Sequence, residues 1–206
     1  MDDISAKNII SLYQRHADIW DKLRKDQGYE KAWLDCFLAL IPSEGHILDI
    51  GCGAGKPIAE YFIERHFSVT GVDASEPMIS ICRERFPEQC WQVADMRLLS
   101  LNVKFDGLIA WDSFFHLTRD DQRAMFAIFK EHAKPGAALM FTSGPGNGEA
   151  IGKFEGEDLY HASLAPDEYR ALFDAHGFRE VKMVAEDPTC AGHTIWLAQF
   201  KGCDSQ

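Results

Sequence analysis

The stretch that decides the fold is His46-Ile47-Leu48-Asp49-Ile50-Gly51-Cys52-Gly53-Ala54-Gly55-Lys56-Pro57. A short apolar strand, 46–50, runs into a turn with a glycine at every second position and then into a helix start at Pro57. Glycine adopts positive φ and carries no Cβ, so a ligand can lie directly against the backbone of this turn. Because the free N–H groups of the first helical turn face the same ligand, the stretch predicts a site for an anionic group such as a carboxylate or a phosphate.

Two helices are expected before this strand. Apolar residues recur at three- and four-residue steps over about 8–25, which indicates an amphipathic helix that Gly28 ends. A second helix covers about 33–40 and stops before Pro42. We therefore expect a helical cap over residues 1–42.

Strands and helices alternate after the glycine turn, which predicts an α/β fold with a mainly parallel sheet and helices on both faces. Ser75 is expected to cap one of these helices. The expected strands are 46–50, 67–72, 90–94, 105–110 and 137–141, and the expected helices are about 57–66, 76–86 and 120–132.

The pattern changes after the strand at 137–141. Residues 143–148 contain three glycines, and no periodicity is visible as far as about residue 165. We expect a flexible loop there, and a loop of this length in a compact domain is usually functional or mobile. The last expected elements are a helix at 166–176, with Gly177 after its end, and strands at 178–185 and 193–200 that pair as an antiparallel hairpin.

Charge and composition narrow the choice of partner. Lys and Arg total 21 against 32 Asp and Glu, which gives a formal net charge of -11. Because nucleic-acid binding depends on basic side chains that neutralise phosphates, a DNA or RNA partner is disfavoured and a small molecule is expected. The six cysteines are scattered, which is typical of free thiols in a reducing compartment. With no signal-peptide pattern and no apolar run of about 18 residues, we expect a cytoplasmic protein without membrane association.

The glycine turn is compatible with two kinds of nucleotide ligand. A dinucleotide fingerprint, G-x-G-x-x-G, requires its third glycine at the position that Lys56 occupies. This departure disfavours a nicotinamide-dependent oxidoreductase, which is kept as an alternative.

The spacing Asp49-x-Gly51-x-Gly53-x-Gly55 resembles motif I of the class I S-adenosylmethionine-dependent methyltransferases. Two further acids strengthen the resemblance, because Asp73 ends the second strand and Asp95 follows the third. One such acid alone is typical of a turn or a helix cap, but three at successive strand ends beside a glycine turn indicate a shared ligand. The resemblance covers about residues 46–143 by motif and the remainder by strand order.

The resemblance implies a Rossmann-like sheet of seven strands, of which the last is antiparallel, and S-adenosyl-L-methionine as the methyl donor, with S-adenosyl-L-homocysteine as its product. Asp49 would order the glycine turn and the methionine moiety, and Asp73 would hold the ribose hydroxyls. Asp95 would contact the adenine together with the backbone of Met96. The implied cofactor residues are Asp49, Gly51, Cys52, Gly53, Gly55, Asp73, Ala74, Asp95, Met96 and Trp111, with Tyr13 and Trp20 from the cap.

Tyr13 and Trp20 lie two turns apart on one face of the first helix. They either pack in the core or fold over the cofactor as a lid. Arg24 continues this face and is a candidate for contact with an acidic substrate group. With this cap, we expect a single domain over 1–206, in which 46–143 bind the cofactor and 144–206 form an acceptor-side segment and the terminal hairpin.

Methyl transfer is an in-line displacement, so the enzyme must align the acceptor and exclude water. A base is useful only where the acceptor must lose a proton. The candidate bases are His116 first, then His193 and His161, although a lone histidine is more often structural. The pair Cys190-x-x-His193 has no second ligand pair at a suitable spacing, so no metal is expected.

The segment after the fourth strand contains Trp111-Asp112-Ser113 and no Asn-Pro-Pro-Tyr tetrapeptide. In the methyltransferases that the chain resembles, that tetrapeptide is the signature of methylation on nucleic-acid bases or amides. A small-molecule acceptor is therefore expected. A non-catalytic module that keeps the cofactor fold is a second alternative, and the sequence leaves the methylated atom and the oligomeric state open.

Overall fold

The computed structural model describes residues 4–24 and 28–202, and a seven-stranded sheet with the order β3-β2-β1-β4-β5-β9-β8 forms its centre. Neighbouring strands from β3 to β5 run parallel, whereas β9 is antiparallel to both β5 and β8. This order confirms the predicted α/β fold with an antiparallel last strand. The strands are β1 His46–Ile50, β2 Ser68–Asp73, β3 Cys90–Val93, β4 Phe105–Ala110, β5 Ala133–Ser143, β8 Phe178–Asp187 and β9 His193–Phe200.

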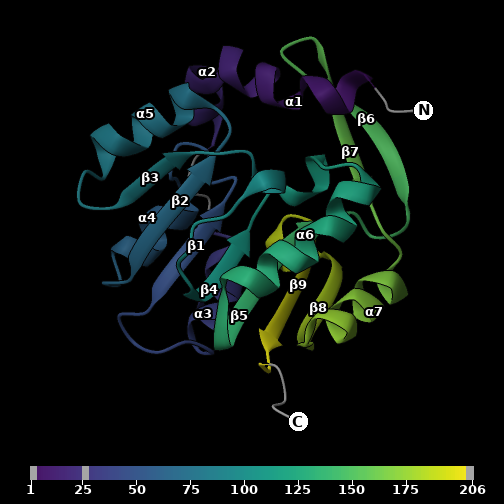
Figure 1. Ribbon diagram of the computed structural model, residues 1–206. Helices are drawn as coiled ribbons and strands as arrows, with labels where there is room; N and C mark the ends of the chain where they lie inside the picture. Colours follow the sequence, from purple (N-terminus) through teal and green to yellow (C-terminus); the bar gives the residue numbers. More distant parts are fainter. Residues whose placement is uncertain (1–3, 25–27, 203–206) are drawn as a thin grey trace.

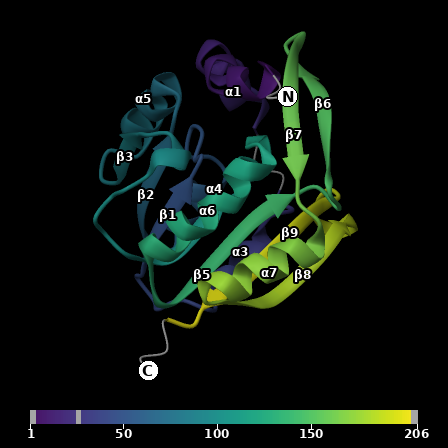
Figure 2. The ribbon, with the colours of Figure 1, turned by 45° about the vertical axis from the view of Figure 1, so that its right-hand side comes forward.

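Helices cover both faces of the sheet, as predicted (Figures 1 and 2). One buried cluster includes Phe129 of α6 and Phe173 of α7. The other includes Phe37 of α3, Phe62 of α4 and Ile79 of α5. The helices are α1 Ile4–Arg15, α2 Ala17–Leu23, α3 Lys31–Leu38, α4 Ile58–Ile63, α5 Glu76–Arg85, α6 Arg119–His132 and α7 Pro166–His176.

The central strand β1 shows why the core has two sides. Ile47 belongs to the cluster under α3 and α4, and its neighbour Leu48 belongs to the cluster under α6, because successive side chains of a strand point to opposite faces. Both side chains are fully buried. A strand covered on both faces is largely apolar, which explains Ile47, Leu48 and Ile50, and the buried Asp49 is the exception in β1.

The carboxyl ends of β1, β2 and β4 meet at one edge of the sheet. The turn after β1 is tied to β2, because the backbone N–H groups of Gly51 and Cys52 both donate to the carbonyl of Val72, at 2.8 and 3.1 Å. Helices α1 and α2 lie across this edge, beside α5 (Figure 1). The topology therefore brings the glycine turn, the acids at the strand ends and the N-terminal cap to one place.

The N-terminal region departs from the predicted single helix over 8–25. Helix α1 begins at Ile4, and the chain leaves helical geometry at His16, which has φ -114° and ψ 20°. The imidazole of His16 lies 2.8 Å from a carboxylate oxygen of Glu157, so the break coincides with a contact to a distant part of the chain. The continuous helical pattern concealed this break, and residues 25–27 lie outside the described part.

The predicted loop over 143–165 is wrong for most of its length. Strands β6 Gly148–Phe154 and β7 Glu157–Ser163 form an antiparallel hairpin that rises beside α1 (Figures 1 and 2). Its two-residue turn, Glu155-Gly156, has positive φ at both positions, as in the turns that join twisted strands. Most of β6 is exposed, so it carries no alternation of apolar and polar side chains that would reveal a strand.

Two smaller expectations also change. Ser75 lies at the N-cap of α5, but its side chain makes no capping bond and its hydroxyl instead donates to the carbonyl of Tyr13 at 3.5 Å. Strand β5 begins at Ala133, ahead of the predicted 137–141, and its pairing with β4 shifts register between Phe105 and Gly107. The segment Lys134-Pro135-Gly136, which precedes the strand expected at 137–141, therefore lies within β5.

Among residues 4–24 and 28–202, no helix is long and apolar enough to cross a membrane. The described cysteines are all free thiols, and Cys203 lies outside the described part. The described free cysteines are Cys36, Cys52, Cys82, Cys90 and Cys190.

Candidate active site

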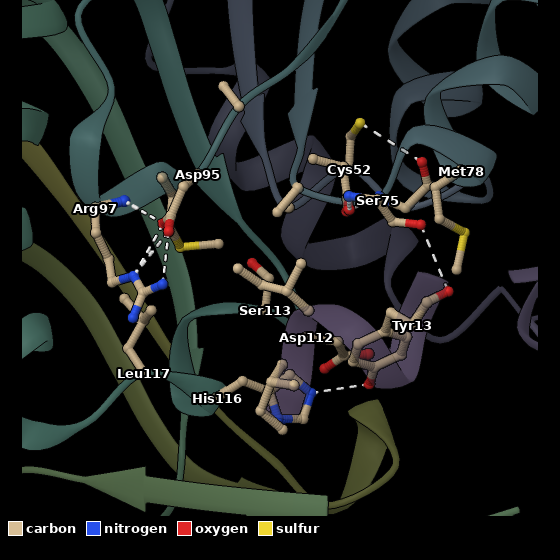
Figure 3. Close-up of a pocket in the computed structure, with 18 of the residues that line it drawn as sticks. Tyr13, Cys52, Ser75, Met78, Asp95, Arg97, Asp112, Ser113, His116 and Leu117 are labelled. Atoms are coloured by element: carbon tan, nitrogen blue, oxygen red, sulfur yellow. Dashed lines mark hydrogen bonds and ion pairs between the residues drawn. The ribbon is translucent and has the colours of Figure 1, made fainter. Parts of the chain in front are cut away.

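A cavity of about 420 Å³ lies between the carboxyl edge of the sheet and the N-terminal helices. The pocket residues in Figure 3 come from the cap, from the glycine turn, and from the segments that follow β2, β3 and β4. The cavity brings together nearly all of the implied cofactor residues. Those that line it are Tyr13, Trp20, Asp49, Gly51, Cys52, Gly53, Asp73, Ala74, Asp95, Met96 and Trp111.

Gly55 is the exception among the implied cofactor residues. It does not line the cavity. A Cβ at this position would lie 3.2 Å from the ring of Phe86 and 3.4 Å from the sulfur of Cys82. Gly55 therefore allows the turn to pack closely against α5 and its C-terminus.

The glycine turn is held by Asp73, at the end of β2. One carboxylate oxygen of Asp73 accepts the backbone N–H of Gly53 at 3.0 Å, and the other accepts that of Ser75 at 2.8 Å. The side-chain bond to a backbone N–H of the turn thus comes from Asp73, and the ordering role expected for Asp49 stays a prediction. Each oxygen of Asp73 keeps a second lone pair, so the carboxylate can still accept hydroxyl groups from a ligand.

Asp49 is buried in the cavity wall, with 2% of its surface exposed. Burial, and then the nearby charge of Asp73, raises its pKa to about 7. Its Oδ2 atom has no hydrogen-bond partner, and the indole N–H of Trp111, also in the wall, has none either. Unpartnered buried polar atoms are rare in folded proteins. One acceptor and one donor beside the same cavity therefore fit a polar ligand.

Asp95 is engaged by its neighbour Arg97. The carboxylate accepts the backbone N–H of Arg97 at 3.0 Å and three bonds from its guanidinium group (Figure 3). Burial raises the pKa of Asp95, but these bonds outweigh it and hold the pKa below its usual value. The methyl carbon of Met96 would lie 3.1 Å from a Cβ at Gly51, so this segment borders the glycine turn directly.

His116, the first candidate base, lies in the cavity wall and is bonded at both ring nitrogens. Nδ1 lies 2.8 Å from the carbonyl oxygen of Tyr160, and Nε2 lies 2.9 Å from the hydroxyl of Tyr13 (Figure 3). Burial lowers the pKa of His116 to about 4. A carbonyl cannot donate, so Nδ1 carries the proton, and neutral Nε2 accepts the hydroxyl proton of Tyr13.

The other two candidate histidines do not line the cavity. His193 lies behind Asp112, with Nε2 at 2.9 Å from that carboxylate and Nδ1 at 2.7 Å from the carbonyl of Cys190. Burial lowers the pKa of His193, but the bond to Asp112 outweighs it and the pKa is raised. His161 is on β7, with its ring 4.9 Å from that of His116, and burial lowers its pKa.

Asp112 also belongs to the site, but sequence reasoning did not assign it a role. It follows β4 with φ 50°, and its carboxylate is bound by Arg24 at 3.0 Å as well as by His193. Arg24 also pairs with the buried Glu30 at 3.2 Å. Its guanidinium group, which was predicted to contact an acidic substrate, is therefore already paired with Asp112 and Glu30. An acid directly after a strand end was the available signal, but its partners come from elements far apart in the chain.

Three aromatic side chains pack together on the cap side of the cavity. The rings of Tyr13 and Trp20 are 5.3 Å apart at their centroids, and Phe154 of β6 packs on both, at 6.1 and 5.6 Å. Glu157 of the same hairpin binds Arg15 and His16 of the cap. The hairpin thus holds α1 over the cavity, and sequence reasoning missed Phe154 because it missed the hairpin.

Within the described residues, no group of three or more histidine, cysteine, aspartate or glutamate side chains could hold a metal ion. His193 contacts the backbone carbonyl of Cys190, while the Cys190 thiol is buried and burial raises its pKa. This pair therefore does not form a metal-binding arrangement.

Comparison with known proteins agrees with this site. A methyltransferase domain model matches residues 47–136. An O-methyltransferase of Pyrenophora dematioidea is 30% identical over 168 residues, which cover 75% of this chain and 62% of that protein. The dTDP-3-amino-3,4,6-trideoxy-alpha-D-glucopyranose N,N-dimethyltransferase of Streptomyces venezuelae is 29% identical over 132 residues, which cover 61% of this chain and 55% of that protein. The chain thus spans little more than half the length of these relatives.

A solved structure shares the fold across nearly the whole chain. It is an S-adenosylmethionine-dependent methyltransferase from Clostridium acetobutylicum, with a TM-score of 0.70 and 19% identity, and the alignment covers 93% of this chain and 100% of that one. The family model, the relatives and this fold agree with the glycine turn and the three strand-end acids. In sequence and in fold, the chain is similar to the class I S-adenosylmethionine-dependent methyltransferases.

Proposed function

We propose that this chain transfers a methyl group from S-adenosyl-L-methionine to a small-molecule acceptor. The observation that carries the proposal is the cavity at the strand ends, in which the glycine turn lies beside the unpartnered buried atoms of Asp49 and Trp111. When bound, S-adenosyl-L-methionine supplies an electrophilic methyl group on a positively charged sulfur. The chain's task is to hold the donor and acceptor in line and to exclude water.

The cofactor residues have distinct chemical roles in this proposal. Asp73 accepts the ribose hydroxyls with its remaining lone pairs, and Asp95 with the Met96 backbone recognises the adenine. Asp49 offers its unpartnered oxygen to the amino group of the methionine end. A Cβ at Gly53 would meet only Trp20, at 3.7 Å, so the turn leaves room for a ligand to lie against the backbone.

The lid residues exclude water from the reacting groups. Tyr13 and Trp20 of the cap close the cavity, and Phe154 supports both rings from outside. Because Tyr13 and Trp20 both border the cavity, this arrangement favours their interpretation as a lid over packing in the core alone.

Small-molecule specificity is supported by the net charge of -11 and by the two relatives, one an O-methyltransferase and one an N,N-dimethyltransferase for an amino sugar nucleotide. We place the protein in the cytoplasm, since its described cysteines are free thiols. We also keep the single-domain division, with a cap at 1–42, a cofactor-binding core at 46–143 and an acceptor-side segment at 144–206.

The two alternatives are less well supported. A nicotinamide enzyme would place a third glycine where Lys56 stands, and Lys56 instead pairs with Glu60 at 2.7 Å beside the turn. A binding module without activity would favour a blocked cleft beside Trp111, whereas the cavity reaches that residue.

Calorimetric titration with S-adenosyl-L-homocysteine tests the proposal. We expect one molecule to bind per chain, and no binding of a nicotinamide dinucleotide by the same protein. A folded protein that binds no S-adenosyl-L-homocysteine or S-adenosyl-L-methionine would contradict the proposal.

A further inference from the structure

The geometry around the Tyr13 hydroxyl points to the chemical class of the methyl acceptor. We propose that the acceptor is an aliphatic amine, methylated on nitrogen, which donates an N–H bond to the Tyr13 hydroxyl oxygen beside the Asp112 carboxylate. This inference rests on the proposed methyltransferase function and narrows it, because the relatives methylate both oxygen and nitrogen by name.

The direction of the Tyr13 hydroxyl is fixed by the residues behind it. His116 is 8% exposed and donates its Nδ1 proton to the Tyr160 carbonyl, so its Nε2 atom can only accept. The Tyr13 proton is therefore committed to His116, at 2.9 Å. The hydroxyl oxygen keeps its lone pairs for the cavity, where it can accept a hydrogen bond but cannot donate one.

Two carboxylates, Asp112 and Asp73, and one guanidinium group, that of Arg24, act on this oxygen, and Arg24 also pairs with Asp112. Asp112 and Asp73 raise the pKa of Tyr13, after the larger effect of burial, while Arg24 lowers it. His161 and Asp112 also act on His116, and burial lowers the pKa of His161 itself. The cavity wall as a whole holds six aspartates against four lysine and arginine side chains. An anionic group is thus disfavoured at this position, and a cationic or proton-donating one is favoured.

An amine suits these conditions throughout the reaction. An aliphatic amine has a pKa of about 10 and is mostly protonated at pH 7, so it first releases one N–H proton to water. The lone pair of the resulting neutral amine then forms the new bond to the methyl carbon, while the electron pair of the breaking carbon–sulfur bond stays on sulfur. The positive charge moves from sulfur to nitrogen, and the product ammonium then releases its N–H proton to water. No anion forms during methyl transfer. The negative charges of Asp112 and Asp73 therefore stabilise the positive charge that develops on nitrogen.

An aliphatic hydroxyl does not suit them. It holds its proton about as tightly as water, with a pKa of about 16, and must lose it as the oxygen attacks. The nearby base is His116, which is reached only through Tyr13 and whose pKa is about 4. The aspartates that raise the pKa of Tyr13 would raise that of either acceptor, but an ammonium group, with a pKa of about 10, loses its proton to water far more readily than a hydroxyl does.

The methylated products of the intact chain test the inference. The protein is incubated with S-adenosyl-L-methionine that carries a trideuterated methyl group, together with an ultrafiltered extract of cellular metabolites, and the labelled products are located by fragmentation in a mass spectrometer. We expect the label on the nitrogen of aliphatic amines. Label on oxygen, sulfur or carbon overturns the inference and leaves the proposed function intact. No labelled product, from protein that binds S-adenosyl-L-homocysteine, overturns the proposed function and this inference with it.

The hydrogen-bond direction has its own test, which does not depend on turnover. Nitrogen-15 NMR of the histidines is expected to show His116 neutral and protonated on Nδ1 from pH 5 to 8. A His116 that is charged, or protonated on Nε2, at pH 7 overturns the inference.

A substitution separates positioning of the acceptor from support of the lid. Tyr13→Phe removes the accepting oxygen and keeps the ring, so kcat/KM for the labelled amine should fall about 10- to 100-fold. Affinity of Tyr13→Phe for S-adenosyl-L-homocysteine should stay within about two-fold of the wild type. The control is Tyr61→Phe, because the Tyr61 hydroxyl binds Asp35 away from the cavity. Its kcat/KM and its affinity should both stay within about two-fold. An equal loss of kcat/KM and of affinity in Tyr13→Phe would assign this residue to the lid alone and overturn the inference.

Discussion

The carboxylate of Asp73, at the end of β2, accepts the backbone N–H of Gly53 at 3.0 Å, and so fixes the glycine turn that follows β1. The same carboxylate caps the turn into α5 through Ser75. One side chain therefore orders two of the segments that border the cavity. The residue proposed to hold the ribose also builds the surface on which the cofactor rests.

Asp73→Ala should weaken S-adenosyl-L-homocysteine binding by about 1–3 kcal/mol, because it removes both the acceptor for the ribose hydroxyls and the support of the turn. Calorimetry measures the change. Asp174→Ala, an exposed aspartate of α7, serves as the control and should bind normally. An unchanged affinity in Asp73→Ala would remove the ribose assignment.

Gly51→Ala should destabilise the fold more than an ordinary glycine substitution. Its Cβ would lie 2.4 Å from the Cβ of Ser113, and the residue has φ 74°. Gly136→Ala is the matched control, since Gly136 has φ 86° and open space around its Cβ, and should cost about 1–2 kcal/mol from the backbone alone. Urea denaturation should show a loss in Gly51→Ala that exceeds the control by about 1–3 kcal/mol. Equal losses would mean that the contact with Ser113 is relieved at little cost.

The buried carboxyl group of Asp49 makes the free energy of unfolding fall as the pH rises. Its pKa rises from 3.8 to about 7 on folding, so the folded chain binds this proton more tightly than the unfolded chain does. The stabilisation is complete below pH 3.8 and is lost as the pH rises through about 7. The Asp49→Asn variant cannot ionise at this position. The free energy of unfolding of the variant minus that of the wild type should therefore be larger at pH 8 than at pH 5. Urea denaturation of both proteins at the two values measures this gain, and a constant difference would show that Asp49 ionises normally.

Phe154→Ala should loosen the lid without unfolding the domain. The ring packs on Tyr13 and Trp20, and aromatic pairs of this kind contribute about 1 kcal/mol each. We expect S-adenosyl-L-homocysteine to dissociate several-fold faster, as followed by stopped-flow tryptophan fluorescence. Ile151→Ala is the control, because Ile151 lies on the same strand and is 47% exposed. If both variants release the ligand at the wild-type rate, the hairpin does not support the lid.

The sheet could be predicted because its buried strands are apolar and its helices are amphipathic. The strand-end acids were also visible, since Asp49, Asp73 and Asp95 follow apolar runs in the sequence. All three line the cavity, but the sequence did not reveal that Asp73 holds the turn or that Arg97 engages Asp95. Those bonds depend on side-chain directions that spacing does not specify.

The acceptor side was harder to predict because it is built from distant segments. Asp112 is held by Arg24 from the cap and by His193 from β9, and no local pattern joins these three positions. The hairpin was missed because β6 is exposed and lacks apolar alternation. His116 was the one histidine whose place after β4 led directly to the cavity.

A crystal structure of the complex with S-adenosyl-L-homocysteine would show directly whether the cofactor occupies this cavity. We expect the ribose hydroxyls within hydrogen-bond distance of Asp73, with the adenine beside Asp95 and Met96 and the sulfur facing Tyr13. A complex in which the ligand binds outside this cavity, or in which Asp73 makes no contact with the ribose, would contradict this expectation.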